Sequence, residues 1–171
     1  LLRNFIRWMY KEKWKYSVAL IAIILTGFIL RIYNLGEMNL LVEEQFHYTP
    51  AVSLLSESQP KMFYTSAEYF GYVNYYRTFA YTATTALIFK VFGVNEFNLR
   101  ILAVFLSTLT IVILYFLAKD LFNKKAALAS SLLFSLSGWA IWYGRYARHY
   151  VFDGLILMLI IWFSYLALFK H

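Results

Sequence analysis

Three long stretches of this chain carry no charged side chain, and their length limits what the chain can fold into. They run over residues 101–118, 126–143 and 155–169. Because a helix rises about 1.5 Å per residue, such runs approach the roughly 30 Å thickness of a bilayer core. We therefore predict membrane-spanning helices and an all-α integral membrane protein.

The composition agrees with a bilayer as the solvent. Of the 171 residues, 61% are hydrophobic and 15% are charged, a balance with which a water-soluble domain of this length would aggregate. The basic residues behind the net charge of +7 are separated by apolar runs, so membrane topology explains them better than nucleic-acid binding. The chain has no cysteine, which excludes disulfides, thiol nucleophiles and Cys-ligated metal ions.

A further apolar run, residues 17–30, follows a basic cluster that the translocation machinery retains in the cytoplasm. No small-residue cleavage site follows the run, so we expect a retained anchor rather than a signal peptide. The prediction is a cytoplasmic segment over residues 1–16 and a first span over residues 17–35. The basic cluster consists of Arg3, Arg7, Lys11, Lys13 and Lys15.

One more apolar run, residues 78–89, is too short to span. Its 12 uncharged residues cover roughly 18 Å, which is typical of a re-entrant or interfacial helix. The basic loop 119–125 is then cytoplasmic, and residues 36–98 form an external loop with membrane-parallel amphipathic helices. Residues 1–171 are thus predicted to be a single transmembrane module. Its other spans are residues 99–118, 126–143 and 151–169.

The external loop is too long for a simple connector, and long loops of this kind usually carry function. Both prolines lie in it, and Pro60 predicts a turn between two surface helices. The topology places seven of the nine acidic residues on the external face. They are Glu37, Glu43, Glu44, Glu57, Glu68, Glu96 and Asp153.

Two adjacent carboxylates, Glu43 and Glu44, follow the first span. On a helix they point about 100° apart, so we expect one to face a cavity while the other caps or braces. His47 lies four residues after Glu43 and is suited to orient that carboxylate or to complete a metal site, although a plain hydrogen bond is commoner. The alternative for the pair is a solvated acidic turn beside the membrane.

A second polar cluster, GRYARHYVFDG, lies between the last two predicted spans. If it is helical, Arg145, His149 and Asp153 share one face, with Arg148 beside them. External arginines run against the positive-inside tendency, and an anionic ligand such as a phosphate would favour them there. The alternative is snorkelling to lipid headgroups. Asp153 lies at the mouth of a span, where an ionisable group is by default a functional candidate.

The two clusters lie about a hundred residues apart, yet the topology predicts both at the same membrane face. There a carboxylate can accept a proton from a hydroxyl or amine while cations stabilise a departing phosphate. A lipid-anchored donor fits, because its tail needs a groove between helices and its headgroup lies at the interface.

The order of these motifs resembles that of the GT-C glycosyltransferases, in particular the protein O-mannosyltransferase and aminoarabinose transferase branch. The similar stretches are residues 31–51, 75–103 and 117–154. The resemblance implies a polyprenyl-phosphate sugar donor, an inverting displacement at the anomeric carbon and an active site on the external or lumenal face. The family core has more than four spans, so we expect either a longer protein or a second membrane subunit.

The resemblance also implies roles for individual residues. The family has an Asp-Glu pair whose first acid is the proposed catalytic residue, and Glu43 and Glu44 match it. Its second acidic position matches Asp153, and its arginine before a tyrosine matches Arg148 with Tyr150.

A proline-containing segment of the family corresponds here to EYFGYVNYYR, which has no proline. Asn74 and Arg77 are the candidate replacements. The predicted catalytic residues are thus Glu43, Glu44 and Asp153, the donor-phosphate residues are Arg145, Arg148 and Arg77, and the supporting residues are His47, His149, Asn74 and Tyr150.

The leading interpretation is a multi-pass glycosyltransferase of the plasma membrane or endoplasmic reticulum. Its expected partners are the lipid-linked donor, membrane lipid and another membrane subunit, with Mg²⁺ or Mn²⁺ left open as a cofactor. Two alternatives remain: a non-catalytic subunit derived from such an enzyme, and a transporter or lipid flippase.

Overall fold

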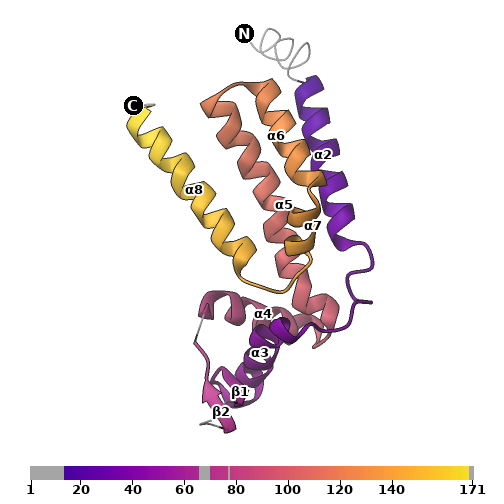
Figure 1. Cartoon of the computed structure of the whole chain (residues 1–171), viewed down its shortest axis with the longest axis vertical. Helices are drawn as coiled ribbons and strands as arrows, with labels where there is room; N and C mark the ends of the chain where they lie inside the picture. Colours follow the sequence, from indigo (N-terminus) through magenta and orange to yellow (C-terminus); the bar gives the residue numbers. More distant parts are fainter. Residues whose placement is uncertain (1–13, 66–69, 77, 170–171) are drawn as a thin grey trace.

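The computed structural model describes residues 14–65, 70–76 and 78–169, which form a helical bundle with a smaller layer at one end (Figure 1). Three bundle helices are long and apolar enough to cross a membrane, and a bent helix pair is a fourth candidate span. This confirms the predicted multi-pass helical membrane protein. The candidate spans are α2 (Trp14–Ile32), α5 (Glu96–Leu121), the pair α6 (Lys124–Leu136) and α7 (Gly138–Gly144), and α8 (Tyr150–Phe169).

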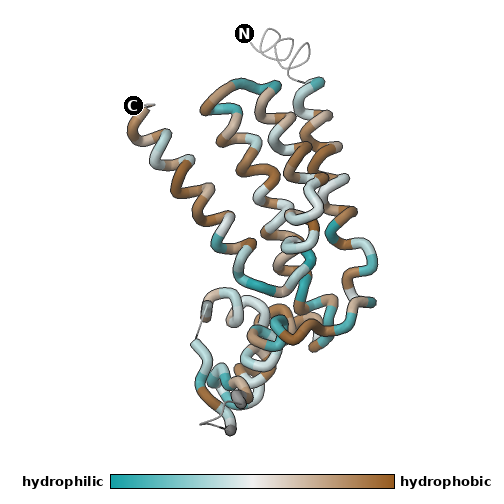
Figure 2. The backbone as a smooth tube through the Cα atoms, viewed as in Figure 1, coloured by the Kyte–Doolittle hydropathy of each residue, from teal (hydrophilic) through white to brown (hydrophobic). Residues whose placement is uncertain are grey.

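Helix α5 is the centre of the bundle and contacts α2, α6, α7 and α8. The side chain of Asn95 caps it by accepting a hydrogen bond from the Asn98 N–H at 2.8 Å, and Asn123 caps α6 in the same way. Such caps satisfy N–H groups that a helix start leaves unpaired. The helices are mainly hydrophobic, whereas the α5–α6 turn at the upper end and the loop before α8 at the lower end are hydrophilic (Figure 2).

The predicted span 126–143 is not one straight helix, because α6 and α7 meet at a 64° bend. Ser137 and Gly138 lie at the break, and Gly/Ser pairs are common sites of helix kinks. The break frees carbonyls at the end of α6, and Arg31 of α2 donates hydrogen bonds to Ser135 O at 3.2 Å and to Phe134 O at 3.4 Å. From the sequence we predict this stretch as one apolar run, without use of the pair of Ser137 and Gly138.

The smaller layer lies below the bundle and contains a hairpin that the sequence analysis did not predict. Pro60 leads into strand β1, not into a second surface helix, because the chain turns back and the Lys61 N–H donates to Ser53 Oγ at 2.6 Å. The elements are a 3-10 turn (Val42–Glu44), α3 (Gln45–Glu57), the antiparallel strands β1 (Lys61–Thr65) and β2 (Phe70–Asn74), and α4 (Phe79–Phe92).

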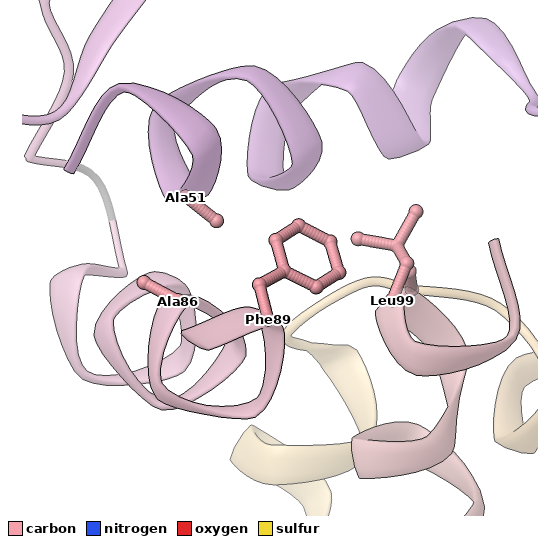
Figure 3. Close-up of a cluster of buried hydrophobic side chains, with 5 residues drawn as sticks. Ala51, Ala86, Phe89 and Leu99 are labelled. Carbon is pink, nitrogen blue, oxygen red and sulfur yellow. The ribbon is translucent and has the colours of Figure 1, made fainter. Parts of the chain in front are cut away.

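A small hydrophobic core joins this layer to the bundle. Figure 3 shows Phe89 of α4 between Ala51 of α3 and Leu99 of α5, with Ala86 on the same side of α4. Ala147, from the loop before α8, completes the cluster. This packing brings the turn at residues 42–44 and the loop at residues 145–149 to the same end of α5.

Candidate functional site

The two polar clusters found in the sequence are in direct contact at the lower end of the bundle. Tyr146 Oη donates to Glu43 Oε2 at 3.0 Å, and the Ala147 N–H donates to Glu44 Oε1 at 3.0 Å. Arg148 Nη1 donates to the Glu43 carbonyl at 2.9 Å. Segments about a hundred residues apart in the chain therefore form one site.

Glu44 and Arg100 form a buried ion pair behind this site. Arg100 Nε donates to Glu44 Oε1 at 2.8 Å and Nη2 donates to Oε2 at 2.6 Å, with 0% of the Glu44 side chain and 1% of the Arg100 side chain exposed. Burial raises the pKa of Glu44, but the hydrogen bonds from Arg100, Ala147 and Leu41 outweigh it and the pKa is lowered. Glu44 is therefore a carboxylate held in its charged form, with both oxygens occupied.

Arg100 also fixes the path of the chain that leads from α2 to the turn. Its Nη1 donates to the carbonyls of Leu35 at 3.0 Å and Met38 at 2.8 Å, and its Nη2 donates to the Asn39 carbonyl at 3.0 Å. A planar guanidinium can serve such a fan of acceptors, whereas an ammonium cannot. The pair thus holds the segment that presents Glu43.

Glu43 is exposed and lies in the wall of a cavity of about 710 Å³. The 3-10 turn directs its side chain away from that of Glu44, so the two neighbours occupy different surroundings. The cavity is formed mainly by α5, α7, the loop before α8 and α8 itself. Its aromatic wall contains Trp139, Trp142, Tyr143, Tyr146 and Tyr150.

Tyr146 is a permanent donor to Glu43 at ordinary pH. Burial, together with the hydrogen bond to the Glu43 carboxylate, raises the pKa of Tyr146 well above its usual value. The phenol therefore stays protonated and keeps the Glu43 side chain oriented.

Arg148 is clamped between two aromatic rings beside the cavity. Its guanidinium carbon lies 5.3 Å from the centre of the Phe46 ring and 5.1 Å from that of Tyr150. Its Nη2 donates to Tyr150 Oη at 3.0 Å, while its buried Nε has no hydrogen-bond partner among the residues that the structure describes. Arg148 is thus a buried cation whose Nε is unpaired among the described residues, and it lies outside both cavity walls.

Arg145 lies in the wall of a second cavity of about 310 Å³, which shares Leu41, Trp142 and Tyr146 with the first. It makes long contacts to the Leu30 carbonyl at 3.4 Å and Met38 Sδ at 3.6 Å. Two of the three predicted phosphate-binding arginines therefore lie in different places, Arg145 in the second cavity and Arg148 next to Tyr150.

The histidines and Asp153 lie on the side of the site that faces the smaller layer and α8. His47 Nδ1 lies 3.0 Å from Thr82 Oγ1, and the ring centres of His47 and His149 are 5.7 Å apart. His149 Nε2 lies 3.6 Å from the exposed carboxylate of Asp153. Within the described ranges, no group of three or more His, Asp or Glu side chains could hold a metal ion.

One predicted residue that the structure describes is not at this site. Asn74 ends strand β2, is exposed and contributes to neither cavity wall described above. Arg77 lies outside the described residues.

Sequence reasoning missed three residues that build the site: Arg100, Tyr146 and Arg31. Arg100 lies at the predicted external start of a span, so the argument used for Arg145 and Arg148, that an external arginine needs an anionic partner, applies to it equally. No sequence feature distinguishes Tyr146 from the other tyrosines, of which the chain has 15 in all.

One comparison with known proteins gave a match. A family model described as dolichyl-phosphate-mannose-protein mannosyltransferase matches residues 77–171, more than half of the chain. The match includes Arg100, Tyr146, Arg148 and Asp153, whereas Glu43 and Glu44 precede it. No curated protein and no solved structure matches the chain.

Proposed function

The chain belongs to the dolichyl-phosphate-mannose-protein mannosyltransferase family and is therefore a membrane glycosyltransferase of the GT-C kind, and from this we propose its reaction. It transfers a sugar from a polyprenyl-phosphate donor to an acceptor hydroxyl or amine. The observation that carries the proposal is the cavity of about 710 Å³, in which an exposed carboxylate meets an aromatic wall between membrane-spanning helices. The lipid tail of the donor would lie along that wall.

In this mechanism Glu43 is the general base. It accepts the proton of the acceptor O–H or N–H while the acceptor atom attacks the anomeric carbon. The bond from the anomeric carbon to the phosphate oxygen breaks on the opposite face, and its electron pair leaves with polyprenyl phosphate. The sugar therefore changes configuration at the anomeric carbon.

The leaving phosphate gains charge, and the arginines are placed to stabilise it. Arg148 contributes positive charge from beside the cavity, Arg145 contributes charge from the neighbouring cavity, and Asp153 orients the acceptor. Glu44 does not touch the substrates in this scheme but braces the turn that presents Glu43. We place this reaction on the external or lumenal face of the plasma membrane or endoplasmic reticulum, with the N-terminus in the cytoplasm.

The test is Glu43→Gln in the full-length protein, assayed for mannose transfer from a polyprenyl-phosphate donor. Loss of a general base lowers the rate about 10²–10⁴-fold. Thermal stability should not change, because the Glu43 side chain is exposed. Glu43→Asp keeps a carboxylate and should retain measurable transfer.

Glu37→Gln is the matched control. Glu37 is an exposed carboxylate on the same loop, bound by the Asn34 amide at 2.8 Å and absent from the wall of the cavity. We expect its transfer rate to stay within about twofold of the unaltered protein. Unaltered turnover in Glu43→Gln would remove Glu43 from the role of base.

A further inference from the structure

A third groove lies at the upper end of the bundle, opposite the Glu43 site. It has a volume of about 350 Å³ and lies between the start of α2 and the α5–α6 turn. Leu20 and Ile21 of α2 and Tyr115 of α5 supply its apolar part, while Lys119 and Lys124 approach it from the two sides of the turn. The groove is thus apolar along the helices and cationic at the turn.

Both lysines are held in place by aromatic rings and not by carboxylates. The Lys119 ammonium lies 5.3 Å from the centre of the Phe116 ring, and the Lys124 ammonium lies 5.6 Å from that of Tyr16. Neither forms an ion pair with a carboxylate of the described residues. A lysine over a ring keeps N–H donors for another acceptor, and the partial desolvation of both side chains favours an anion as that acceptor.

Asp120, the carboxylate next to Lys119 in the sequence, makes contacts with α8. Its Oδ2 accepts a hydrogen bond from Trp162 Nε1 of α8 at 2.9 Å, and its backbone carbonyl accepts one from Tyr165 Oη at 3.1 Å. These contacts connect Asp120 to α8, and no ion pair joins it to Lys119 or Lys124 among the described residues.

The position of the groove identifies the class of ligand. The groove lies at the end of two helices that can cross a membrane, where the hydrophobic surface of the bundle meets the hydrophilic α5–α6 turn (Figure 2). We propose that it binds an anionic phospholipid, with the phosphate between Lys119 and Lys124 and an acyl chain against Leu20 and Ile21. A free phosphate would leave the apolar part uncovered, and a zwitterionic lipid would bring its own cation to the two lysines.

The test measures lipid bound to the purified full-length protein. The protein in mild detergent is titrated with dioleoyl phosphatidylglycerol or dioleoyl phosphatidylcholine, and bound lipid is counted by native mass spectrometry. We expect a preference of at least about tenfold for phosphatidylglycerol. Each lysine near a phosphate contributes roughly fivefold, so Lys119→Gln/Lys124→Gln should weaken phosphatidylglycerol binding about 25-fold.

Two variants separate a built site from general attraction. Lys125→Gln removes the same charge one residue from Lys124, on an exposed side chain outside the groove, and should leave binding within about twofold. Lys119→Arg/Lys124→Arg keeps both charges and should retain the preference, which also checks that the turn still folds. If Lys125→Gln weakened phosphatidylglycerol binding as much as the double Gln variant does, the proposal would be overturned. Equal binding of phosphatidylglycerol and phosphatidylcholine would also overturn it.

Transfer kinetics make this site distinguishable from the Glu43 site. The double Gln variant should keep its KM for the polyprenyl-phosphate donor, and Glu43→Gln should keep its lipid preference. A donor KM that rises together with the loss of phosphatidylglycerol would assign the groove to the donor and overturn the proposal.

Discussion

Glu43 and Glu44 are neighbours in the chain, but they belong to two regions of opposite character. Glu44 is fully buried, and its two oxygens accept hydrogen bonds from Arg100, Leu41 and Ala147. Glu43 is exposed in a cavity wall, and its carboxylate accepts a hydrogen bond from Tyr146. The difference teaches that accessibility, not residue type, determines which of two adjacent carboxylates is free for chemistry.

The buried region contains a second arginine, Arg31. It is 0% exposed, and its Nε donates to Ser107 Oγ at 2.7 Å while its Nη1 donates to the Gly27 carbonyl at 2.9 Å. Ser107 lies in the wall of the same cavity as Glu43. The buried region is thus a polar support on which the wall of the cavity is built.

The largest effect is expected from breaking the Glu44–Arg100 pair. Arg100→Met leaves a buried carboxylate without its cation, which costs about 3–5 kcal/mol of the free energy of unfolding. Denaturant or thermal unfolding in detergent would measure it. Arg145→Met, at a half-buried arginine with long contacts, should cost less than about 1 kcal/mol. Similar losses of stability in both variants would mean that the buried pair is no more structural than the half-buried Arg145.

The second prediction concerns the packing around Arg31. A Cβ at Gly144 would lie 2.5 Å from Ser107 Oγ and 2.9 Å from Arg31 Nε, so in Gly144→Ala both side chains or the α7 backbone must shift. We expect a loss of about 1–3 kcal/mol in the free energy of unfolding, as for other overpacked sites. Gly154→Ala is the control, because a Cβ there meets nothing within 4 Å, and it should be neutral or stabilising. Equal stability of the two variants would show that Arg31 can move without cost.

The third prediction is the response to acid. The pKa of Glu44 is lower in the folded than in the unfolded protein, so its contribution to stability is complete above the unfolded value of about 4.3 and is lost as the pH falls through the folded value. The slope from this one group is at most about 1.4 kcal/mol per pH unit. The loss of stability in acid should persist in Glu43→Gln and be absent in Glu44→Gln/Arg100→Met. Its disappearance in Glu43→Gln would assign the acid response to the exposed carboxylate.

The sequence predicted the features of the fold that depend on where a bilayer tolerates charged side chains. Charge-free runs identified the spans, and the 12-residue run was too short to be one: α4, with 14 residues, is not among the candidate spans. The charge pattern also placed Glu43 and Arg148 at the same end of the bundle, where they are in contact. These features follow from where charges are tolerated in a bilayer, which a single sequence records directly.

The features that the sequence did not predict depend on long-range packing. Glu44 and Arg100 are separated by 56 positions, and nothing local to either residue selects the other. The break at Ser137 depends on Arg31, which satisfies the freed carbonyls from another helix. The hairpin depends on Ser53, which fixes where the chain turns after α3.

The smallest effect is expected from the hydrogen bond between Tyr146 and Glu43. Tyr146→Phe removes the group that orients the proposed base, so we expect the transfer rate to fall about tenfold, equivalent to about 1.4 kcal/mol of barrier. The free energy of unfolding should change by less than about 1.5 kcal/mol, because one hydrogen bond is lost where water can replace it. Since the raised pKa of Tyr146 keeps the phenol protonated, the deficit should be constant between about pH 6 and 9.

Tyr143→Phe is the control for this effect. Tyr143 lies in the same cavity wall and packs edge-on against Tyr150. Among the described residues it makes no hydrogen bond to Glu43 or Glu44. It removes the same oxygen from the same cavity, so it should leave the rate within about threefold. An equal deficit in Tyr143→Phe would mean that the polarity of the cavity limits the reaction, not the orientation of Glu43. A deficit confined to Tyr146→Phe would instead connect the exposed carboxylate, through its single phenol partner, to the rate of sugar transfer.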